Sequence, residues 1–430
     1  MRIVVVGAGA REHALARNLS AEHEVIVTPG NAGMTQDVEV VDRDAAELNP
    51  DLVVIGPEAP LVAGLADRLN AQGILALGPG ADGARLEGSK AFLKKICAEA
   101  GVPTAAFGVA TSVEMGRALL DRFGPPYVIK TDGLAAGKGV LVTNDRREAD
   151  EDLVAKLSGV AFGEAGPRVV IEEPMVGREL SVFALCNGRD FVLLPEARDY
   201  KRLRDGDLGP NTGGMGSISP VPGIGSDVID AVASTMIAPT LVRLAELGIE
   251  YRGILYAGVM LTTSGPRLVE YNVRLGDPEA EAVLPRITSG LGEALAAAAR
   301  GETIPPLEVS PLCAATVIVA APGYPEHPIT GQVIQGIDEA RALPGVGVFA
   351  AGVKAQTIEA PSAAPYAAMP DSVTSQETQR LAARGLVTNG GRVLAVTGLG
   401  ADPQETRERA YRGVDLIDFD GRVVRRDIGS

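Results

Sequence analysis

Short apolar runs alternate with helix-like segments along residues 1–102. RIVVV, EVIVT, LVVIG and ILALG are each bounded by glycine or proline, and apolar residues recur at helical spacing between the first two runs. Strands that alternate with helices are typical of a parallel, doubly wound sheet, whose ligands bind at the carboxyl ends of the strands. The pattern therefore predicts such a sheet, with Gly7, residues 28–33 and residues 56–60 at its ligand edge.

The rest of the chain has a different pattern. Residues 109–182 combine the short runs YVIK and GVLV with a helical stretch and two further runs, which predicts a small α+β unit. Residues 191–300 contain strands, a glycine-rich loop and helices, and residues 311–430 open on the strand CAATVIVA. Residues 355–371 are rich in alanine and proline without a sustained period, which predicts a surface loop. The predicted fold class is thus multidomain, α/β and α+β.

Composition and charge narrow the class of protein. The chain has 430 residues, of which 46% are apolar, and its 55 acidic and 40 basic residues give a net charge of -15. That charge argues against nonspecific binding to nucleic acid or to an anionic membrane. Cys97, Cys186 and Cys313 lack the spacing of a metal site, and the opening apolar run is too short for a signal peptide or a membrane span. We therefore expect a cytoplasmic protein.

Three glycine- or proline-rich loops follow predicted strands at the ligand edge. The GAG motif at 7–9 lacks the third glycine of a dinucleotide site, because Glu12 stands there, and Thr28 stands where such a site has an acidic residue. The motif is either a tight turn or a place where backbone amides hold one phosphate. Asn31 and Glu58, in PGNAG and GPEAP, could bind ribose hydroxyls or an amine. Each loop alone is typical of a turn, and the three together favour a site.

The segment KTDGLAAGKGV, residues 130–140, is similar to a phosphate loop but departs from the Walker A pattern. A strand-like run follows Lys138, where a Walker loop has a hydroxyl residue and a helix. The segment therefore predicts two strands joined by a glycine loop, with Lys130 and Lys138 as point charges for a triphosphate. A hairpin with solvated lysines is the alternative.

Carboxylates end the strand in VVIEEPMVGREL, residues 169–180. Glu172 and Glu173 are followed by Pro, Met and Val, so the segment could offer backbone groups to an adenine and a carboxylate to a ribose. Glu179 follows at a short interval for the same task. An exposed strand end is the alternative interpretation.

A second strand, PRLVEYNVR, places Glu270, Asn272 and Arg274 two residues apart and hence on one face. Magnesium prefers oxygen ligands and binds proteins through one or two carboxylates, which favours Glu270 and Asn272 as a metal pair. Arg274 could meet a carboxylate or a γ-phosphate. An exposed antiparallel edge is the alternative, but the opposite face is apolar, which favours a cleft.

The stretch 196–220 joins charged residues to a glycine-rich loop, and such long irregular stretches in compact domains are usually functional or disordered. Asp199, Lys201 and Arg202 could orient a zwitterion or stabilise charge during a transfer.

Eight strings together resemble one family. They are, in order, GAGAREHAL, PGNAG, GPEAPL, EGSKAFLK, KTDGLAAGKGV, GPNTGGMG, EYNVRLGDPE and VTNGGRVLAVTGLG, and the resemblance runs from Met1 to about Gly429. They resemble the phosphoribosylamine-glycine ligases, which are ATP-grasp enzymes of de novo purine biosynthesis. The resemblance implies that ATP phosphorylates glycine and that 5-phosphoribosylamine attacks the glycyl phosphate, giving glycinamide ribonucleotide, ADP and phosphate. It also implies Mg²⁺, with Mn²⁺ as a substitute, and a monomer with no nucleic-acid or membrane partner.

The resemblance also implies a domain order. An N-terminal substrate-binding α/β domain would span 1–102, and a central catalytic ATP-grasp domain would comprise 103–122 and 190–308. An ATP-grasp lid would span 123–189, and a mixed α/β C-terminal domain would span 309–430.

Roles carry over by position in the family's motifs. The ATP contacts would be Lys90, Lys130, Lys138, Glu172, Glu173, Pro174, Val176 and Glu179, and the metal ligands Glu270 and Asn272. The catalytic residues would be Arg274, Lys138, Asp199 and Lys201, of which Asp199, Lys201 and Arg274 would hold glycine. Phosphoribosylamine would bind Gly9, Glu12, Asn31, Pro57 and Glu58.

Two features depart from the family. Members often have QDHKR where this chain has RDYKR, so that Tyr200 replaces a histidine, and the Ala/Pro-rich stretch after Val353 is longer than usual. Three alternatives remain open on the residues alone: an ATP-grasp ligase for another acid and amine, an NAD-linked dehydrogenase, and a nucleotide sensor without turnover.

Overall fold

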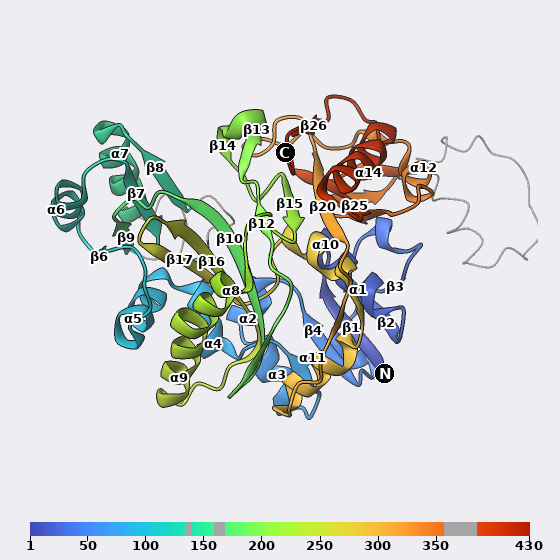
Figure 1. Ribbon diagram of the computed structural model, residues 1–430, viewed down its shortest axis with the longest axis horizontal. Coiled ribbons are helices and arrows are strands. Elements are labelled where there is room, and N and C mark those ends of the chain that lie inside the picture. The colour runs from blue at the N-terminus through green and yellow to red at the C-terminus, as the bar shows by residue number, and fades with distance from the viewer. Residues whose placement is uncertain (135–138, 159–167, 357–384) are drawn as a thin grey trace, which may run out of the picture.

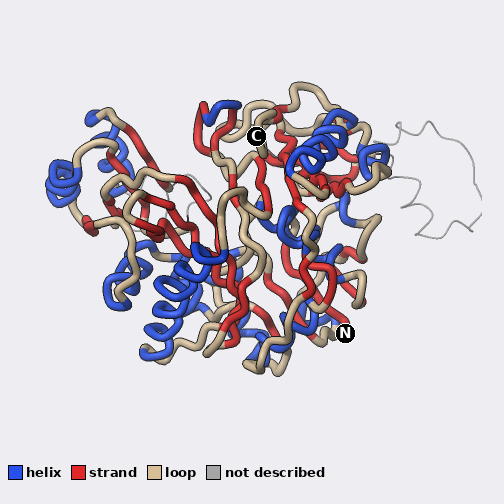
Figure 2. Tube along the Cα trace, in the orientation of Figure 1, coloured by secondary structure: helices blue, strands red, loops and turns tan. Residues whose placement is uncertain are grey.

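The computed structural model describes residues 1–134, 139–158, 168–356 and 385–430 (Figure 1). Sheets run through the middle of the molecule and helices lie around them (Figure 2). Lys138 and all but the first two residues of the predicted loop 355–371 lie outside the described residues.

The N-terminal domain is the predicted parallel sheet. Its five strands have the order β3-β2-β1-β4-β5, every pair is parallel, and β1 and β4 are almost wholly buried. The elements are β1 (Arg2–Gly7), α1 (Ala10–Leu19), β2 (Glu24–Pro29), η1 (Ala32–Met34), β3 (Glu39–Val40), η2 (Ala45–Leu48), β4 (Leu52–Ile55), α2 (Glu58–Val62), α3 (Leu65–Ala71), β5 (Ala76–Leu77), α4 (Ala81–Gly88) and α5 (Lys90–Ala100). The alternation of apolar runs and helices therefore predicted this domain correctly.

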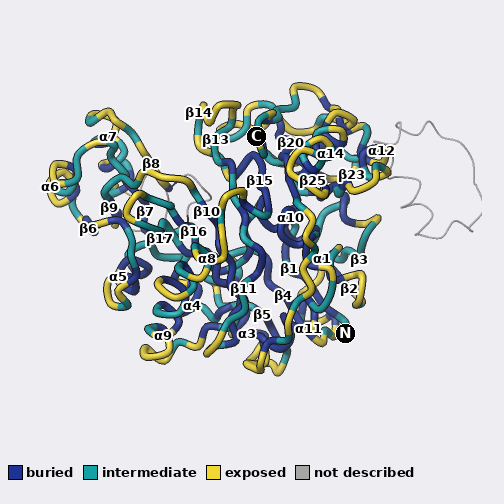
Figure 3. The backbone as a smooth tube through the Cα atoms, viewed as in Figure 1, coloured by how far each residue is buried: buried dark blue, intermediate teal, exposed yellow. Residues whose placement is uncertain are grey.

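A small antiparallel sheet follows, with the order β6-β9-β7-β8. It consists of β6 (Phe107–Ala110), β7 (Tyr127–Thr131), β8 (Val140–Thr143) and β9 (Val169–Glu172), with α6 (Val113–Phe123) and α7 (Arg146–Leu157) beside it. Ile129, Leu153 and Ile171 are in its core, whereas the outward sides of the two helices are exposed (Figure 3). Because β6 pairs with β9, residues 107–122 belong to this unit, which corrects their assignment to the central domain.

The central antiparallel sheet has the order β11-β10-β16-β17. Its strands are β10 (Arg178–Asn187), β11 (Phe191–Leu193), β16 (Arg252–Thr262) and β17 (Gly265–Asn272), and its helices are α8 (Ser226–Val232), η5 (Ala233–Ile237), α9 (Ala238–Glu246), α10 (Glu279–Val283), η6 (Leu284–Arg286) and α11 (Leu291–Arg300). Strand β10 pairs with β16 along its whole length, so residues 178–187 lie in this sheet and not in the predicted lid.

The helical segment Ser226–Glu246 is long and apolar enough to cross a membrane by length and composition alone, and one such helix is weak evidence. Met236, Ile237 and Leu244 from this segment are buried in one core with residues of β10 and β16. The apolar positions thus have a partner within the domain.

The C-terminal sheet has the order β12-β15-β20-β25-β22, with β26 beside β20. The elements are β12 (Arg198–Asp199), β15 (Gly216–Ser219), β20 (Cys313–Ala320), α12 (Ile337–Arg341), β22 (Val346–Ala350), β25 (Arg392–Gly400), α14 (Pro403–Leu416) and β26 (Val423–Val424). Smaller pairs are β13 (Arg202–Arg204) with β14 (Leu208–Asn211), β18 (Ile287–Ser289) with β19 (Glu308–Val309), and β24 (Leu386–Thr388) between β21 (Val333–Ile334) and β23 (Val353–Ala355).

Strands β12 and β15 come from the stretch 196–220, which the sequence predicted to lack regular structure and to belong to the central domain. Both expectations are wrong for these strands, because β15 pairs with β20 and so joins the C-terminal sheet. The stretch therefore links the central and C-terminal parts of the molecule.

Candidate active site

A cleft of about 430 Å³ is lined by residues from the N-terminal, small antiparallel, central and C-terminal parts of the molecule. Among the described residues, the charged ones that line the cleft are Arg11, Glu58, Glu87, Lys90, Asp199, Lys201, Glu270, Arg274, Asp277, Glu279 and Arg392. Asn272, Tyr256, Gly133 and Gly139 also line it. The cleft therefore brings together residues that are far apart in the sequence. Seven of them were predicted for the site: Glu58, Lys90, Asp199, Lys201, Glu270, Asn272 and Arg274.

Glu270 and Asn272 lie at the end of β17 and both line the cleft. They pair with Gly258 and Tyr256 of β16, and the intervening Tyr271 is buried on the other face, where its hydroxyl lies 2.9 Å from that of Thr240. Burial opposes ionisation of Glu270, but Lys130, Lys201 and Lys90 outweigh it and lower the pKa of this carboxyl group. A charged carboxylate beside an amide oxygen fits a hard divalent cation.

A buried ion-pair cluster lies beneath the cleft. The two carboxylate oxygens of Glu172 lie 3.1 Å from Lys94 Nζ and 2.9 Å from Lys130 Nζ. Lys94 Nζ also donates to Thr104 Oγ1 at 2.7 Å, and burial lowers the pKa of Lys94. Glu172 thus fixes the position of Lys130, one of the predicted triphosphate contacts.

The sequence analysis did not single out Lys94. Its position in the sequence could have indicated a place near the site, because Lys94 follows Lys90 by four residues in α5 and residues at this spacing lie on one helix face.

Lys90 reaches from the start of α5 to the glycine loop, where its Nζ donates to the Gly133 carbonyl at 3.1 Å. Burial lowers the pKa of Lys90, with the carboxylate of Glu270 opposing the change. The neighbouring Asp132 accepts from Ser89 Oγ at 2.8 Å and from the Ala91 amide at 3.1 Å, which joins the loop to the helix. The loop that was predicted to contact phosphates thus begins beside a buried lysine.

The other predicted ATP contacts follow β9. Glu173 pairs with Arg267 at 2.7 Å and accepts from the Ala106 amide at 2.9 Å. Val176 is 83% exposed, and Glu179 forms an ion pair with Lys201.

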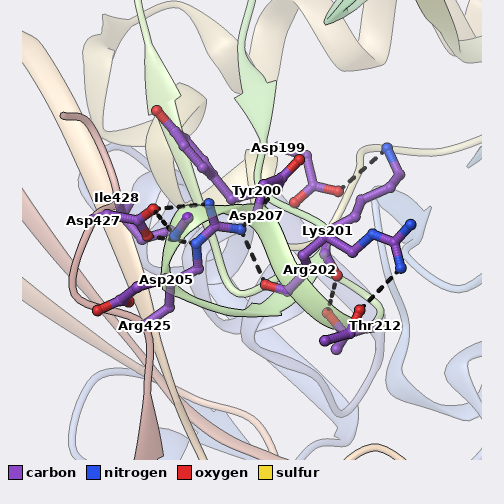
Figure 4. A network of polar contacts seen from close by, with 12 residues as sticks. Asp199, Tyr200, Lys201, Arg202, Asp205, Asp207, Thr212, Arg425, Asp427 and Ile428 are labelled. Atoms are coloured by element: carbon purple, nitrogen blue, oxygen red, sulfur yellow. Dashed lines mark hydrogen bonds and ion pairs between the residues drawn. The ribbon is translucent and has the colours of Figure 1, made fainter.

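Asp199 and Lys201 lie side by side at one wall of the cleft (Figure 4). Lys201 Nζ is 3.4 Å from Asp199 Oδ2, and it also contacts Glu179. Burial raises the pKa of Asp199 to about 8, with Lys201 opposing and Glu279 adding to the rise. Asp199 Oδ1 is buried without a hydrogen-bond partner among the described residues. It is therefore an acceptor available to a donor in the cleft.

The Tyr200 ring is directed away from Asp199 and Lys201 (Figure 4). The Tyr200 ring lies 4.9 Å from the guanidinium carbon of Arg198 and 5.1 Å from that of Arg425, and its hydroxyl accepts from the Gly429 amide. Arg202 donates to the Gly209 carbonyl within the β13–β14 hairpin. In this chain position 200 thus contacts the C-terminal segment.

Two of the predicted phosphoribosylamine contacts are engaged inside the N-terminal loops. Glu12 is buried, accepts from the Gly9 amide at 2.7 Å and pairs with Arg11 at 2.6 Å. Asn31 accepts from the Gly33 amide and donates to the Ala8 carbonyl, both at 2.8 Å. Among Gly9, Glu12, Asn31, Pro57 and Glu58, only Glu58 is among the described residues that line the cleft.

Arg274 lies beyond the end of β17, two residues after Asn272. Its guanidinium is 2.6 Å from Glu87 Oε1 and 3.3 Å from Glu58 Oε2, so it bridges two acidic groups of the N-terminal domain. Burial raises the pKa of Glu87, whereas Arg274 and Arg11 outweigh burial and lower the pKa of Glu58.

The C-terminal domain supplies Arg392, which the sequence analysis missed although its motif VTNGGRVLAVTGLG was noted. Its guanidinium lies 3.0 Å from Asp277 Oδ2 and donates to the carbonyls of Asp277 and Gly213. It therefore holds the loop that follows β17 against the glycine-rich loop before β15.

Comparison with family models matches nearly the whole chain. Models described as phosphoribosylglycinamide synthetase match residues 1–87 as the N domain, 88–280 as the ATP-grasp (A) domain and 314–430 as the C domain. The chain belongs to the phosphoribosylglycinamide synthetase family. Membership confirms the predicted resemblance, and an NAD-linked dehydrogenase is no longer an alternative.

Relatives of the phosphoribosylglycinamide synthetase family agree. The chain is similar to the phosphoribosylamine-glycine ligase of Mesorhizobium japonicum, with 42% identity over 100% of this chain and 98% of that one. It is also similar to the crystal structure of that ligase from Thermotoga maritima, with 38% identity, a TM-score of 0.83 and coverage of 99% and 100%. Biotin carboxylase from Campylobacter jejuni, at 13% identity and a TM-score of 0.67, shares the fold. The ATP-grasp fold of the family implies ATP and a divalent metal as the groups that this cleft serves.

Proposed function

We propose that the chain joins the carboxyl group of glycine to the amine of 5-phosphoribosylamine with ATP, giving glycinamide ribonucleotide, ADP and phosphate in purine biosynthesis. The observation that carries the proposal is the shared cleft. It combines a metal pair, lysines for phosphates and the unpaired carboxylate oxygen of Asp199 in a member of the phosphoribosylglycinamide synthetase family.

The nucleotide is proposed to lie between the small sheet and the central sheet. Lys90 and Lys130 would contact its phosphates, with Lys138, which lies outside the described residues, as a third contact. The segment 172–176 would border the adenine, and Glu179 would bind the ribose. Mg²⁺, or Mn²⁺ in its place, would bind Glu270 and Asn272 and neutralise charge on the phosphates.

Glycine is proposed to bind at the wall formed by Asp199 and Lys201. Its ammonium group would donate to Asp199 Oδ1, which is buried without a partner among the described residues. Its carboxylate would face Lys201 and Arg274, both of which line the cleft. This orientation directs a carboxylate oxygen toward the phosphates.

The reaction is proposed to take two steps. A carboxylate oxygen of glycine attacks the γ-phosphorus, the bond to the β-γ bridging oxygen breaks, and ADP leaves. The amine of 5-phosphoribosylamine then attacks the acyl carbon of glycyl phosphate, phosphate leaves, and the amine loses a proton. Acyl phosphates hydrolyse readily, so exclusion of water from the cleft would protect this intermediate.

Phosphoribosylamine is proposed to enter from the N-terminal domain. Gly9, Glu12, Asn31 and Pro57 would shape its loops and Glu58 would face it in the cleft. We also propose a cytoplasmic monomer without nucleic-acid or membrane partners, supported by the net charge of -15.

The test is substrate dependence. ADP release should require both glycine and phosphoribosylamine, and hydroxylamine should trap glycine hydroxamate when ATP and glycine alone are supplied. A chain that binds ATP but releases no ADP with both substrates present would not be this ligase. Turnover without any trapped hydroxamate would contradict the two-step route.

A further inference from the structure

A histidine and two glutamates converge on the side of the N-terminal domain opposite the catalytic cleft. Glu22 and His23 lie in the turn between α1 and β2, and Glu293 lies in the first turn of α11 in the central domain. One ligand atom from each lies within 4.8 Å of the others. The turn precedes the first residue of β2, whereas the cleft is reached from the carboxyl ends of the parallel strands. Figure 1 shows α11 beside the N-terminal domain near the chain's first residues.

His23 is the central residue of this cluster. Its side chain is 5% exposed, and its Nε2 is buried without a hydrogen-bond partner among the described residues. That nitrogen lies 3.5 Å from Glu293 Oε2, while the other ring nitrogen lies 3.5 Å from the N-terminal ammonium group of Met1. A buried ring nitrogen with no partner requires an explanation, because such groups are normally satisfied.

The space for the ring depends on Gly292. A Cβ atom at this position would lie 2.0 Å from His23 Nε2, so a larger residue would displace the imidazole. The close approach of the helix backbone therefore fixes Nε2 beside the Glu293 carboxylate.

Capping of α11 explains only part of the arrangement. The Glu22 carboxylate accepts from the Gly290 amide at 3.2 Å, and an acidic residue in a first turn is favoured by the helix dipole. Neither interaction explains why the His23 imidazole lies in the same cluster as the two carboxylates. The two carboxylates still supply more negative charge than the sum of roughly half a positive charge at the helix N-terminus and the single charge of the Met1 ammonium group, so the local field favours a cation.

We propose that Glu22, His23 and Glu293 bind a divalent transition metal of the zinc class. One imidazole nitrogen and two carboxylate oxygens form a three-ligand set that zinc accepts at bond lengths of about 2.0–2.2 Å, with water in the fourth position. Ligand atoms around such an ion are about 3.3 Å apart. The 3.5 Å between Nε2 and Glu293 Oε2 matches that spacing. Imidazole disfavours Mg²⁺, which prefers oxygen alone.

The ion would connect two domains. Glu22 and His23 belong to the N-terminal domain and Glu293 to the helix that follows the central sheet, so the ion would restrain one against the other at the edge remote from the cleft. Its effect is thus on stability and domain orientation.

Zinc binding by untagged, chelator-treated protein tests the proposal, because an affinity tag of histidines would bind zinc itself. Equilibrium dialysis should show one bound Zn²⁺ per chain that is lost in Glu293→Gln and in His23→Gln. Glu270→Ala should retain this ion, which separates it from any metal at the catalytic pair. Glu114→Gln, in the exposed first turn of α6, is the matched control and should also retain it.

Two readouts make the result independent of activity. Zinc should raise the thermal midpoint of the wild-type chain and leave that of Glu293→Gln unchanged, and anomalous diffraction should place the ion on His23 Nε2. Glu293 is 57% exposed, so this variant is expected to fold even if His23→Gln does not. Equal zinc stoichiometry in the wild type, Glu293→Gln and a folded His23→Gln would overturn the proposal, as would a wild-type chain that binds no zinc.

Discussion

Replacing Glu172 by glutamine tests the buried cluster beneath the cleft. The Glu172 side chain is 3% exposed, and those of its partners Lys94 and Lys130 are 1% and 7% exposed. Removing one member of a buried ion pair costs about 3–5 kcal/mol, because the remaining charge stays desolvated. Glutamine keeps one oxygen acceptor, and Lys94 keeps its hydrogen bond to Thr104. We therefore expect a loss of about 3 kcal/mol in the free energy of unfolding.

Glu173→Gln is the matched control. It alters the adjacent residue, whose side chain is 33% exposed and pairs with Arg267, which is 29% exposed. Ion pairs as exposed as this one contribute about 0–1 kcal/mol to the free energy of unfolding. Each kcal/mol lost from the free energy of unfolding lowers the thermal midpoint of a large domain by roughly 2 °C or more. Glu172→Gln should therefore melt about 6 °C lower than the wild type. The control should melt within about 2 °C of it.

The pH dependence of this deficit gives a second check. Without Glu172, the buried Lys94 loses its counterion, so its folded-state pKa falls further below the unfolded value of about 10.4. The folded variant then binds fewer protons than the unfolded chain, and its deficit shrinks as the pH rises toward 10. Equal thermal midpoints for Glu172→Gln and Glu173→Gln, or a deficit that grows with pH, would refute this account. Loss of a fixed Lys130 should also raise the KM for ATP.

Four further predictions concern single groups. Glu270→Ala should abolish ligase turnover at ordinary magnesium while circular dichroism stays unchanged, and full activity would refute the metal assignment. The pKa of Asp199 is about 8, so kcat/KM for glycine should rise with pH through that value, and Asp199→Asn should lose this limb of the profile while its KM for ATP changes little. Burial lowers the pKa of His13, whose Nδ1 accepts a hydrogen bond from the Ala350 amide at 2.8 Å. Because the unfolded chain then binds a proton more readily than the folded one, wild-type stability should fall as the pH drops below about 6.5. A similar fall in His13→Gln would contradict this. Gly292→Ala should destabilise the chain although alanine favours helices, and His23→Ala should remove most of that loss if the 2.0 Å contact is the cause.

Local periodicity predicted the parts of the site that lie within one element. Glu270 and Asn272 were placed on one face of a strand by their spacing, and both line the cleft. The parallel N-terminal sheet followed in the same way from alternating apolar runs. In such segments the spacing of apolar residues indicates which face is buried, because one face of a strand or helix must be covered by the rest of the domain.

Polar residues at loops were harder to interpret from sequence. Glu12 and Asn31 were expected to contact phosphoribosylamine, and in the structure they accept hydrogen bonds from the backbone amides of Gly9 and Gly33. A carboxylate or amide next to a glycine turn has the same appearance in the sequence whether it accepts from a ligand or from the turn itself. The turn contacts therefore required the structure, and the substrate contacts of these two residues stay a prediction.

Long-range partners set the limit of prediction from sequence. Lys94 has the pattern of an ordinary helix lysine, and it is buried because Glu172 and Thr104 arrive from other elements to pair with it. Arg392 begins a strand of the C-terminal sheet, and it reaches the cleft because β12 and β15 join that sheet. Such residues acquire their role from a partner whose position depends on the completed fold. The ion-pair cluster around Glu172 and the contacts of Arg392 with the Asp277 loop therefore required the structure, whereas the placement of Glu270 and Asn272 on one strand face did not.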